Sequence, residues 1–301
     1  MKAPLVSIIL PLYNGAAFIE ETLKSLEKQS FQEAELIVID DESTDDGPEK
    51  IRKFCEKSSA PILKSLKLIL QKNTGVAGAR NHGVELAEGF YLAPLDQDDL
   101  WEANRLEEMV NLLQGEKKRW GYSAFTRFYA SGKKVLKCDG SKKPSETLEK
   151  LVGGGLFIPP SAALVEKSLV LETGGFVSEY APSDDWDFFL KLAETSDGAW
   201  TPKPLVFFRS HKTSTAKRQR ATIFLAQEKV LAFHEPLVKK GIAQKFLEKR
   251  RAAINLHLAL VAWQEDDKKE AKRRFQNSIA ANPTRFKTRW LYLKFLLGAR
   301  G

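Results

Sequence analysis

Four apolar runs alternate with amphipathic segments through the first hundred residues. The runs cover residues 6–10, 36–39, 66–70 and 90–95, and their apolar positions are nearly continuous. Between them, the apolar positions of 18–26 and 75–87 repeat at helical spacing, and a further helix opens near Asp45 with Pro48 in its first turn. Such strands, separated by helices, are typical of a parallel sheet covered on both faces. We therefore predict an α/β fold for this part of the chain.

The pattern becomes less regular and then entirely helical further along. Residues 120–129 and 133–137 predict a hairpin around Ser131 and Gly132. A helix opens within 183–187, and 205–208 predicts a last strand. From about Thr215 the apolar positions follow helical spacing, and the pair 256–264 and 268–281 is weakly similar to a single tetratricopeptide repeat, too few for a stable array. We predict two parts, residues 1–214 and a helical appendage at 215–301.

The two predicted parts carry opposite charge. The formal net charge is +8, but residues 212–301 hold 21 Lys and Arg against 7 Asp and Glu, whereas residues 1–211 hold 26 against 32. Opposite charges suggest two physical roles. The basic part suits an anionic membrane surface, with a solvated helical face as the alternative. Its basic clusters at 217–220 and 249–251 have few aromatic neighbours and no recognised motif, which argues against nucleic acid as a partner.

Cysteine content and hydropathy indicate the cellular compartment. Cys55 and Cys138 lie far apart in the sequence, with neither CxxC spacing nor a disulfide framework. The opening residues show no signal-peptide pattern, and no apolar stretch approaches the ~20 residues that a membrane span needs. These features predict a cytoplasmic protein that is at most peripheral at the inner face of the cell membrane.

Acidic residues follow two of the predicted strands. Asp40 and Asp41 follow the second strand, and Asp96, Asp98 and Asp99 follow the fourth. The carboxyl ends of parallel strands share one edge of the sheet, where ligands bind. Clustered carboxylates repel one another unless a cation neutralises them, and oxygen ligands suit Mg²⁺ or Mn²⁺, which commonly serve a phosphate group. The alternative is an acidic turn that caps a helix beginning near Trp101.

Six segments, taken together and in order, resemble the family 2 glycosyltransferases, which have the GT-A fold. The resemblance covers about residues 4–215 and leaves the helical tail outside. It implies an enzyme that moves a sugar, with inversion, from a nucleotide-diphosphate sugar to a hydroxyl of a saccharide or lipid-linked acceptor, in the synthesis of cell-envelope or surface polysaccharide. The segments are 6–14, 38–45, 78–81, 95–99, 174–176 and 184–187.

The resemblance also implies roles for residues on the donor side. Asp41 would recognise the nucleobase, and Arg80 would pair with phosphate. Asp98 would bind the Mg²⁺ or Mn²⁺ that bridges the diphosphate, and His211 would approach the same metal. The residues implied to bind the nucleotide sugar are Pro11, Tyr13, Asn14, Asp40, Asp41, Gly78, Arg80, Asn81, Asp96 and Gln97.

On the acceptor side, Asp185 matches the position of the catalytic base. A carboxylate there would take the proton of the acceptor hydroxyl. Asp184 stands where the family commonly has Glu, and Trp186 either stacks on a sugar or packs in the core. The alternative for Asp184 and Asp185 is a pair that caps a helix starting at Trp186. Asp99 would orient its loop or cap the next helix.

Three other protein classes are alternatives to this resemblance. A Rossmann dehydrogenase requires a G-x-G-x-x-G turn after the first strand, which here reads Pro11-Leu-Tyr-Asn-Gly15. A metal-dependent nucleotidyltransferase needs a glycine-rich phosphate loop near that strand, which we do not find. A basic module that binds the membrane surface without catalysis remains the non-enzymatic alternative.

Overall fold

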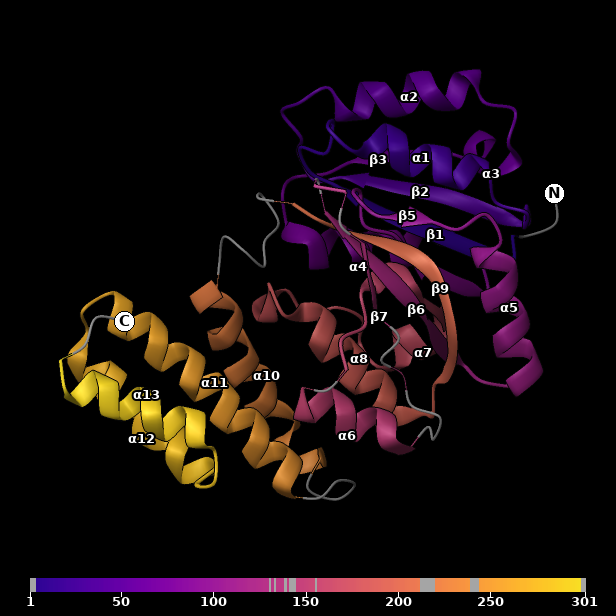
Figure 1. The fold of residues 1–301 in the computed structure, drawn as a ribbon. Helices are drawn as coiled ribbons and strands as arrows, with labels where there is room; N and C mark the ends of the chain where they lie inside the picture. The colour runs from indigo at the N-terminus through magenta and orange to yellow at the C-terminus, as the bar shows by residue number, and fades with distance from the viewer. Residues whose placement is uncertain are drawn as a thin grey trace.

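A mixed sheet forms the centre of the molecule (Figure 1). The computed structural model describes residues 4–129, 131–132, 134–137, 140, 145–154, 156–211, 220–238 and 244–298. Within these residues nine strands run in the order β3-β2-β1-β4-β8-β6-β9-β5, with β7 beside β6. The strands are β1 (Val6–Leu12), β2 (Ala34–Asp40), β3 (Lys67–Leu70), β4 (Tyr91–Pro94), β5 (Leu100–Trp101), β6 (Trp120–Tyr129), β7 (Lys134–Lys137), β8 (Ala163–Glu166) and β9 (Ala199–Ser210).

Helices cover both faces of this sheet, and four more follow it in the chain. The sheet domain also contains two short 3₁₀ helices, η1 (Pro160–Ala162) and η2 (Ser178–Tyr180). The α-helices are α1 (Ile19–Glu27), α2 (Gly47–Lys57), α3 (Pro61–Lys64), α4 (Gly75–Leu86), α5 (Arg105–Glu116), α6 (Ser145–Gly153), α7 (Lys167–Glu172), α8 (Asp184–Thr195), α10 (Arg220–Val238), α11 (Gln244–Gln264), α12 (Lys268–Ala281) and α13 (Phe286–Leu296).

The first four strands are parallel, as their nearly continuous apolar runs predicted. Side chains alternate between the two faces of a strand, so Ile8 and Leu10 of β1 pack with α1, α2, α3 and α5, while Ile9 packs with α4 and α8. Both faces are buried, which explains why the run does not alternate with polar residues. The predicted hairpin is also observed, because β6 and β7 pair antiparallel with Phe125 opposite Lys137.

The helix expected to begin near Trp101 is not there. Leu100 and Trp101 form β5, which pairs antiparallel with Phe207 and Val206 of β9, and α5 begins only at Arg105. The buried indole of Trp101 donates to the carbonyl of Ser161 at 2.9 Å. Pairing with a distant strand and burial of the ring therefore prevail over the local preference of an acidic turn for a helix start.

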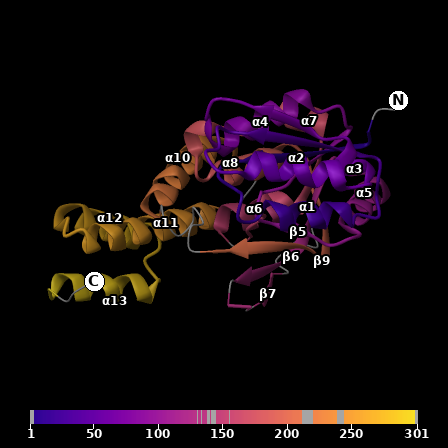
Figure 2. The same ribbon diagram turned by 90° about the horizontal axis from the view of Figure 1, so that it is seen from above.

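The helical appendage shares a core with the sheet domain. Val230 of α10 and Ile254 of α11 belong to the same buried cluster as Phe188 of α8, whereas α11, α12 and α13 meet around Phe275 in a separate cluster. Figure 2 shows α11 to α13 extending to one side of the sheet. The predicted boundary between 214 and 215, Cys138, and residues 217–219 of the first basic cluster lie outside the described residues. In the part of the chain that is described, no helix is both long and apolar enough to span a bilayer.

A buried ionic network fastens α10 to α8. His234 of α10 is fully buried, with Nε2 2.9 Å from Asp187 Oδ1 and Nδ1 2.8 Å from Glu194 Oε1. Lys191 adds a cation 2.9 Å from the other oxygen of Asp187. Burial opposes a charge on the imidazole, but the hydrogen bonds to Asp187 and Glu194 outweigh it, so the pKa of His234 is raised.

Replacing His234 with alanine is expected to destabilise the fold by about 3–5 kcal/mol, because it leaves buried carboxylates without their partner. A group with a raised folded-state pKa stabilises most fully below its unfolded pKa, and the effect is lost as pH rises through the folded value. The cost of the substitution should therefore shrink in alkaline solution. Urea unfolding of both proteins across pH measures it, and a cost independent of pH would contradict the charged network.

Candidate active site

The segments that follow β1, β2 and β4 meet at one edge of the sheet. The amide of Asp41 donates to Leu12 at the end of β1, at 2.8 Å. Beyond β1, the amide of Tyr13 donates to Gln97 Oε1 at 2.9 Å, and Gln97 Nε2 returns a bond of 3.1 Å to the carbonyl of Tyr13. The common edge expected from parallel strands is therefore observed, and Tyr13 and Gln97 join two of its loops directly.

Asp41 is held rigidly at the start of α4. Its buried carboxylate accepts from the amides of Thr74 and Gly75, both at 2.9 Å, and from Gln71 Nε2 at 2.7 Å. A carboxylate at a helix N-terminus is stabilised by the free amides and the helix dipole. Asp40 is also buried, and its Oδ1 accepts from the amide of Ser43 at 3.1 Å. The role of Asp41 in reading a nucleobase stays a prediction.

Asn14 shapes the loop after β1. Its backbone is left-handed, with φ of 49°, a conformation that asparagine tolerates better than most residues. Its Oδ1 accepts from the amide of Thr44 at 2.8 Å, which ties the loop after β1 to the loop after β2. Pro11 is buried within β1, while Tyr13 is half exposed beside this junction. The loop therefore offers one aromatic ring at the edge of the sheet.

Arg80 joins the loop after β4 to the start of α8. Its Nη2 donates to Asp96 Oδ1 at 2.6 Å and its Nη1 to Asp184 Oδ2 at 3.0 Å. The guanidinium is buried, 5.1 Å from the centre of the Phe176 ring. Both terminal nitrogens of Arg80 donate to carboxylates, and two such charge-assisted bonds stabilise a buried guanidinium. A guanidinium has five N–H groups, and Nε of Arg80 has no hydrogen-bond partner among the described residues, so these two bonds do not exclude a phosphate. Pairing of Arg80 with phosphate stays a prediction.

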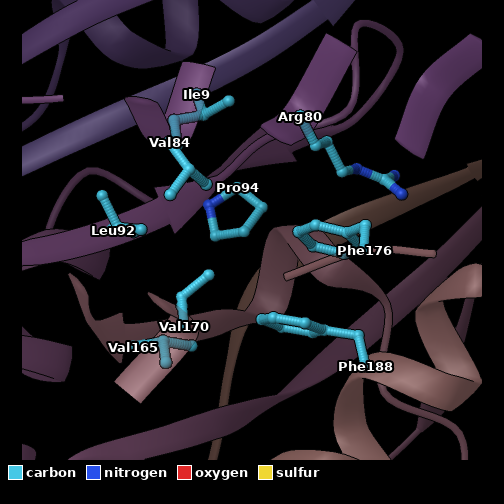
Figure 3. A pocket seen from close by; sticks show the side chains of 9 residues that line it. All are labelled: Ile9, Arg80, Val84, Leu92, Pro94, Val165, Val170, Phe176 and Phe188. Atoms are coloured by element: carbon cyan, nitrogen blue, oxygen red, sulfur yellow. The ribbon is translucent and has the colours of Figure 1, made fainter. Parts of the chain in front are cut away.

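The pocket beneath Arg80 is too small for a substrate. Figure 3 shows it between Arg80 and the apolar side chains of β1, β4 and α8. Its volume is about 10 Å³, which is near the lower limit for one water molecule. It is lined by Ile9, Arg80, Val84, Leu92, Pro94, Val165, Val170, Phe176 and Phe188.

Gly78 and Asn81 lie on α4, where Asn81 holds the backbone of Phe176 in place. Asn81 Nδ2 donates to the carbonyl of Phe176 at 2.7 Å, and its Oδ1 accepts from the Phe176 amide at 2.9 Å. A Cβ on Gly175, where φ is 62°, would lie 2.6 Å from Asn81 Oδ1, and one on Gly78 would lie 2.3 Å from Thr74 Oγ1. The motif at 174–176 is thereby fixed against α4, below Arg80. Binding of the donor by Gly78 and Asn81 stays a prediction.

Asp98 and His211 are in direct contact. His211 Nε2 lies 2.7 Å from Asp98 Oδ2, although 113 residues separate them in the chain. Arg209 Nε donates to the carbonyl of Asp98 at 2.8 Å. Burial and the charge of Asp96 raise the pKa of Asp98. A cation bound beside Asp98 would oppose both effects and stabilise its ionised form.

Asp99 orients the loop and does not cap a helix. It is buried, with Oδ2 accepting from Ser161 Oγ at 2.7 Å and Oδ1 from the amide of Arg209 at 2.9 Å. These bonds connect the loop after β4 to η1 and to the end of β9, and they set the direction in which Asp98 projects. Of the two roles expected for Asp99, the structure shows the first.

A divalent ion would fit this site only if the protein and the diphosphate shared its coordination. No group of three or more His, Cys, Asp or Glu side chains in the described part of the chain is placed to hold a metal. Asp98 and His211 supply adjacent oxygen and nitrogen donors. One carboxylate oxygen of Asp96 accepts a hydrogen bond from Arg80. The remaining positions around Mg²⁺ or Mn²⁺ would then fall to diphosphate oxygens and water. Metal binding by Asp98 and His211 stays a prediction with which these residues are compatible.

Asp185 is a partly exposed carboxyl with a raised pKa, and its role as the base stays a prediction. It lies in the first turn of α8, is partly exposed, and accepts from the Trp186 amide at 2.7 Å. Desolvation, with a further contribution from the charge of Asp184, raises the pKa of Asp185 to about 7. A base is most effective when its pKa lies near the working pH. Asp184 is buried against Arg80, and α8 begins at Asp184, two residues before the start at Trp186 assumed by the capping alternative.

Trp186 packs in the core. Its Nε1 donates to the carbonyl of Leu151 at 3.1 Å, and the guanidinium of Arg250 from α11 lies 4.4 Å from its ring centre. Of the two roles expected for the ring, the structure shows packing and not a face open to a sugar. Trp186 therefore anchors α8, which carries Asp184 and Asp185, against the helical appendage.

Sequence reasoning missed three residues that support the site. Gln71 bonds to both Asp41 and His82, Ser161 bonds to the Asp96 amide and to Asp99, and Thr22 Oγ1 donates to the carbonyls of Gln97 and Asp99 at 2.9 and 3.0 Å. Thr22 gave one signal, a polar residue on the buried face of its helix. Gln71 lies in a loop and Ser161 in the three-residue η1, and neither segment has a pattern that gives a signal.

A comparison with models of protein families shows the class of protein. The family model for glycosyl transferase family 2 matches residues 7–168, more than half of the chain, and the chain belongs to that family. A putative teichuronic acid biosynthesis glycosyltransferase, TuaG of Bacillus subtilis, is 36% identical over 43% of this chain and 50% of its own length. WfaP of Escherichia coli, a UDP-Glc:alpha-D-GlcNAc-diphosphoundecaprenol beta-1,3-glucosyltransferase, is 36% identical over 40% of this chain and 46% of its own length. The chain thus spans about half the length of these relatives.

Solved structures show the same fold. TarS residues 1–349 of S. aureus, in complex with UDP-GlcNAc, has a TM-score of 0.70 over 92% of this chain and 81% of that one, with 16% identity. The mannosyltransferase PcManGT of Pyrobaculum calidifontis, in complex with GDP-Man and Mn²⁺, has a TM-score of 0.61 over 99% of this chain and 81% of that one, with 20% identity. The predicted GT-A fold, followed by C-terminal helices, is confirmed.

Proposed function

We propose that this protein transfers a sugar from a nucleotide-diphosphate sugar to an acceptor hydroxyl and inverts the anomeric centre. One observation carries the proposal. Arg80 bonds to Asp96 on the donor loop and to Asp184, the neighbour of Asp185. A single buried side chain thereby fixes the position of the loop after β4 relative to the first turn of α8, which carries Asp185. Proximity of this kind between a bound donor and a base is what group transfer requires.

The two sides have separate tasks in the proposed reaction. On the donor side, the loops around Asp41 and Tyr13 receive the nucleoside, and Asp98 with His211 would hold Mg²⁺ or Mn²⁺. Such an ion offsets the charge that develops on the leaving diphosphate. On the acceptor side, Asp185 takes the hydroxyl proton as the oxygen attacks the anomeric carbon. Attack from the face opposite the leaving group produces inversion.

The acceptor we propose is a saccharide, free or lipid-linked, in the synthesis of cell-envelope or surface polysaccharide. Support comes from the names of two relatives. WfaP is named for a diphosphoundecaprenol-linked acceptor, and AmsB of Erwinia amylovora, 29% identical over 64% of each chain, is named for amylovoran biosynthesis. Family membership favours catalysis over the purely membrane-binding alternative. A nucleotidyltransferase would release pyrophosphate, whereas the proposed reaction releases a nucleoside diphosphate.

A thermal-shift screen of nucleoside diphosphates, each with and without Mn²⁺, tests the donor half of the proposal. A ligand that binds only the folded state stabilises it by about 2.7 kcal/mol at one hundred times its Kd. We expect one nucleoside diphosphate to raise the melting temperature selectively, and Mn²⁺ to increase the shift. If no nucleoside diphosphate stabilises the protein under either condition, the proposed function is wrong.

The pH dependence of transfer should report Asp185. Because its pKa is raised to about 7, the carboxylate needed as base is lost as pH falls through neutrality, and kcat/KM for the acceptor should fall with it. Asp184→Asn removes a negative neighbour that contributes to this shift, so the acidic limb should move to lower pH. Initial rates at saturating donor measure both profiles. An identical limb in the two enzymes would contradict the assignment of that limb to Asp185.

A further inference from the structure

Helix α13 presents an apolar stripe to solvent. Phe286, Trp290 and Leu293, together with Leu297 just after the helix, follow one another at i, i+4, i+7 and i+11, so they lie on one face. Their exposed fractions are 77%, 46%, 54% and 76%. Water-exposed apolar surface of this kind, gathered in one stripe, marks an interaction site.

The opposite face of α13 is already packed against the protein. Leu291, Tyr292 and Phe295 lie against the cluster around Phe275, where the rings of Phe295 and Trp263 are 5.7 Å apart. Thr288 on the same side is fully buried. This packing fixes the rotation of α13 about its own axis. The apolar stripe is therefore held outward by the fold, and no other described segment covers it.

Basic residues border the stripe on both sides. At helical spacing, Arg285 and Arg289 fall along one edge, and Lys287 and Lys294 along the other. Residues 283–301 contain no Asp or Glu. Lys294 Nζ lies 3.9 Å from the centre of the Trp290 ring, so a basic side chain of this edge is in direct contact with the apolar stripe. Long basic side chains beside apolar residues are how interfacial helices meet lipid headgroups.

We propose that α13 is a membrane-docking helix, which lies flat on an anionic lipid surface with Phe286, Trp290, Leu293 and Leu297 inserted below the headgroups. Charge selects this occupant over a second copy of the chain, because two such stripes would bring like charges together. Lipid instead offers both an apolar layer and negative headgroups. The proposal does not depend on the proposed catalytic function.

The hairpin strand β7 extends the same surface. Figure 2 places β7 and α13 on the same side of the molecule. Lys134 of β7 is exposed, as is Leu136, at 57%. A flat surface that touches α13 could therefore also meet an apolar and a basic side chain of the sheet domain. Two separated contacts would fix the tilt of the enzyme and hold the catalytic edge at a constant height above the membrane.

Co-sedimentation of the full chain with vesicles tests the proposal. The probes are vesicles of phosphatidylcholine with phosphatidylglycerol and vesicles of phosphatidylcholine alone. We expect binding to the anionic vesicles and little to the neutral ones. Trp290→Ser with Leu293→Ser should weaken that binding by about tenfold or more, because each substitution removes apolar area that the lipid would bury. Lys287→Glu with Arg289→Glu should weaken it as well, chiefly at low salt.

A matched variant separates the stripe from general hydrophobicity. Phe90→Ser with Leu171→Ser removes two exposed apolar side chains from the sheet domain, and it should bind anionic vesicles like the original protein. Melting temperatures of all variants, measured without vesicles, check their folding.

Failure of the original protein to bind anionic vesicles, or unchanged binding of the Trp290 and Leu293 variant, would overturn the proposal. So would a dimer in light scattering that this variant abolishes, because the stripe would then join two copies. Donor-induced thermal shifts need no vesicles, so the two proposals fail independently.

Discussion

An Asp185→Asn enzyme is expected to lose sugar transfer while it still binds its donor. General base catalysis contributes about 10²–10⁴-fold to a rate, and the amide cannot accept the hydroxyl proton. Asparagine has nearly the same shape, so the loop that carries Asp41 and the pair of Asp98 with His211 should not move. Transfer is measured as release of nucleoside diphosphate with acceptor present, and donor binding as the thermal shift.

Separate measurements of donor binding and of sugar transfer decide the role of Asp185. Asp197→Asn serves as the matched control, because its carboxylate is exposed and pairs only at 3.6 Å with Lys118, and it should retain full transfer. A structural role for Asp185 would instead reduce donor binding and thermal stability together with transfer. In that event the base would have to be sought elsewhere, and the proton-transfer step assigned to Asp185 would be withdrawn.

The first parallel strands of the sheet could be predicted from the sequence, whereas the short strands β5 and β8 could not. Strands β1, β2 and β4 are buried on both faces, so their nearly continuous apolar sequence is itself the signal. Strand β5 has two residues and β8 has four. Such short segments carry too little pattern, and their extended form comes from pairing with β9 and with β4 and β6, which the local sequence does not encode.

The residue types of the candidate site could be predicted from the sequence, but the side chains that they contact could not. The acidic residues at strand ends were visible because parallel topology places those ends together. The contact of Arg80 with Asp184 spans 104 residues and depends on how α4 and α8 pack, so the sequence alone did not show that Arg80 bonds to Asp184. His234 was missed for the same reason. Nothing within α10 shows that Asp187 and Glu194 of another helix will surround it.

Asp98→Ala is expected to abolish the metal dependence of transfer along with nearly all activity. Asp98 and His211 are the two contacting donors at this edge, and loss of one leaves a cation held by a single protein ligand. The charge on the leaving diphosphate would then be poorly offset, and one such electrostatic contribution is typically worth about 10²–10³-fold in kcat.

A second observable separates metal binding from loop structure in the Asp98 variant. Asp99, with its bonds to Ser161 and Arg209, orients the loop independently of the Asp98 side chain. The loop should therefore survive, and the melting temperature without ligand should change little. The additional stabilisation that Mn²⁺ gives to the nucleoside diphosphate complex should disappear in Asp98→Ala and weaken in His211→Ala. If Asp98→Ala keeps that manganese-dependent increment, the ion binds elsewhere, and the pair of Asp98 and His211 serves only to join the end of β9 to the loop after β4.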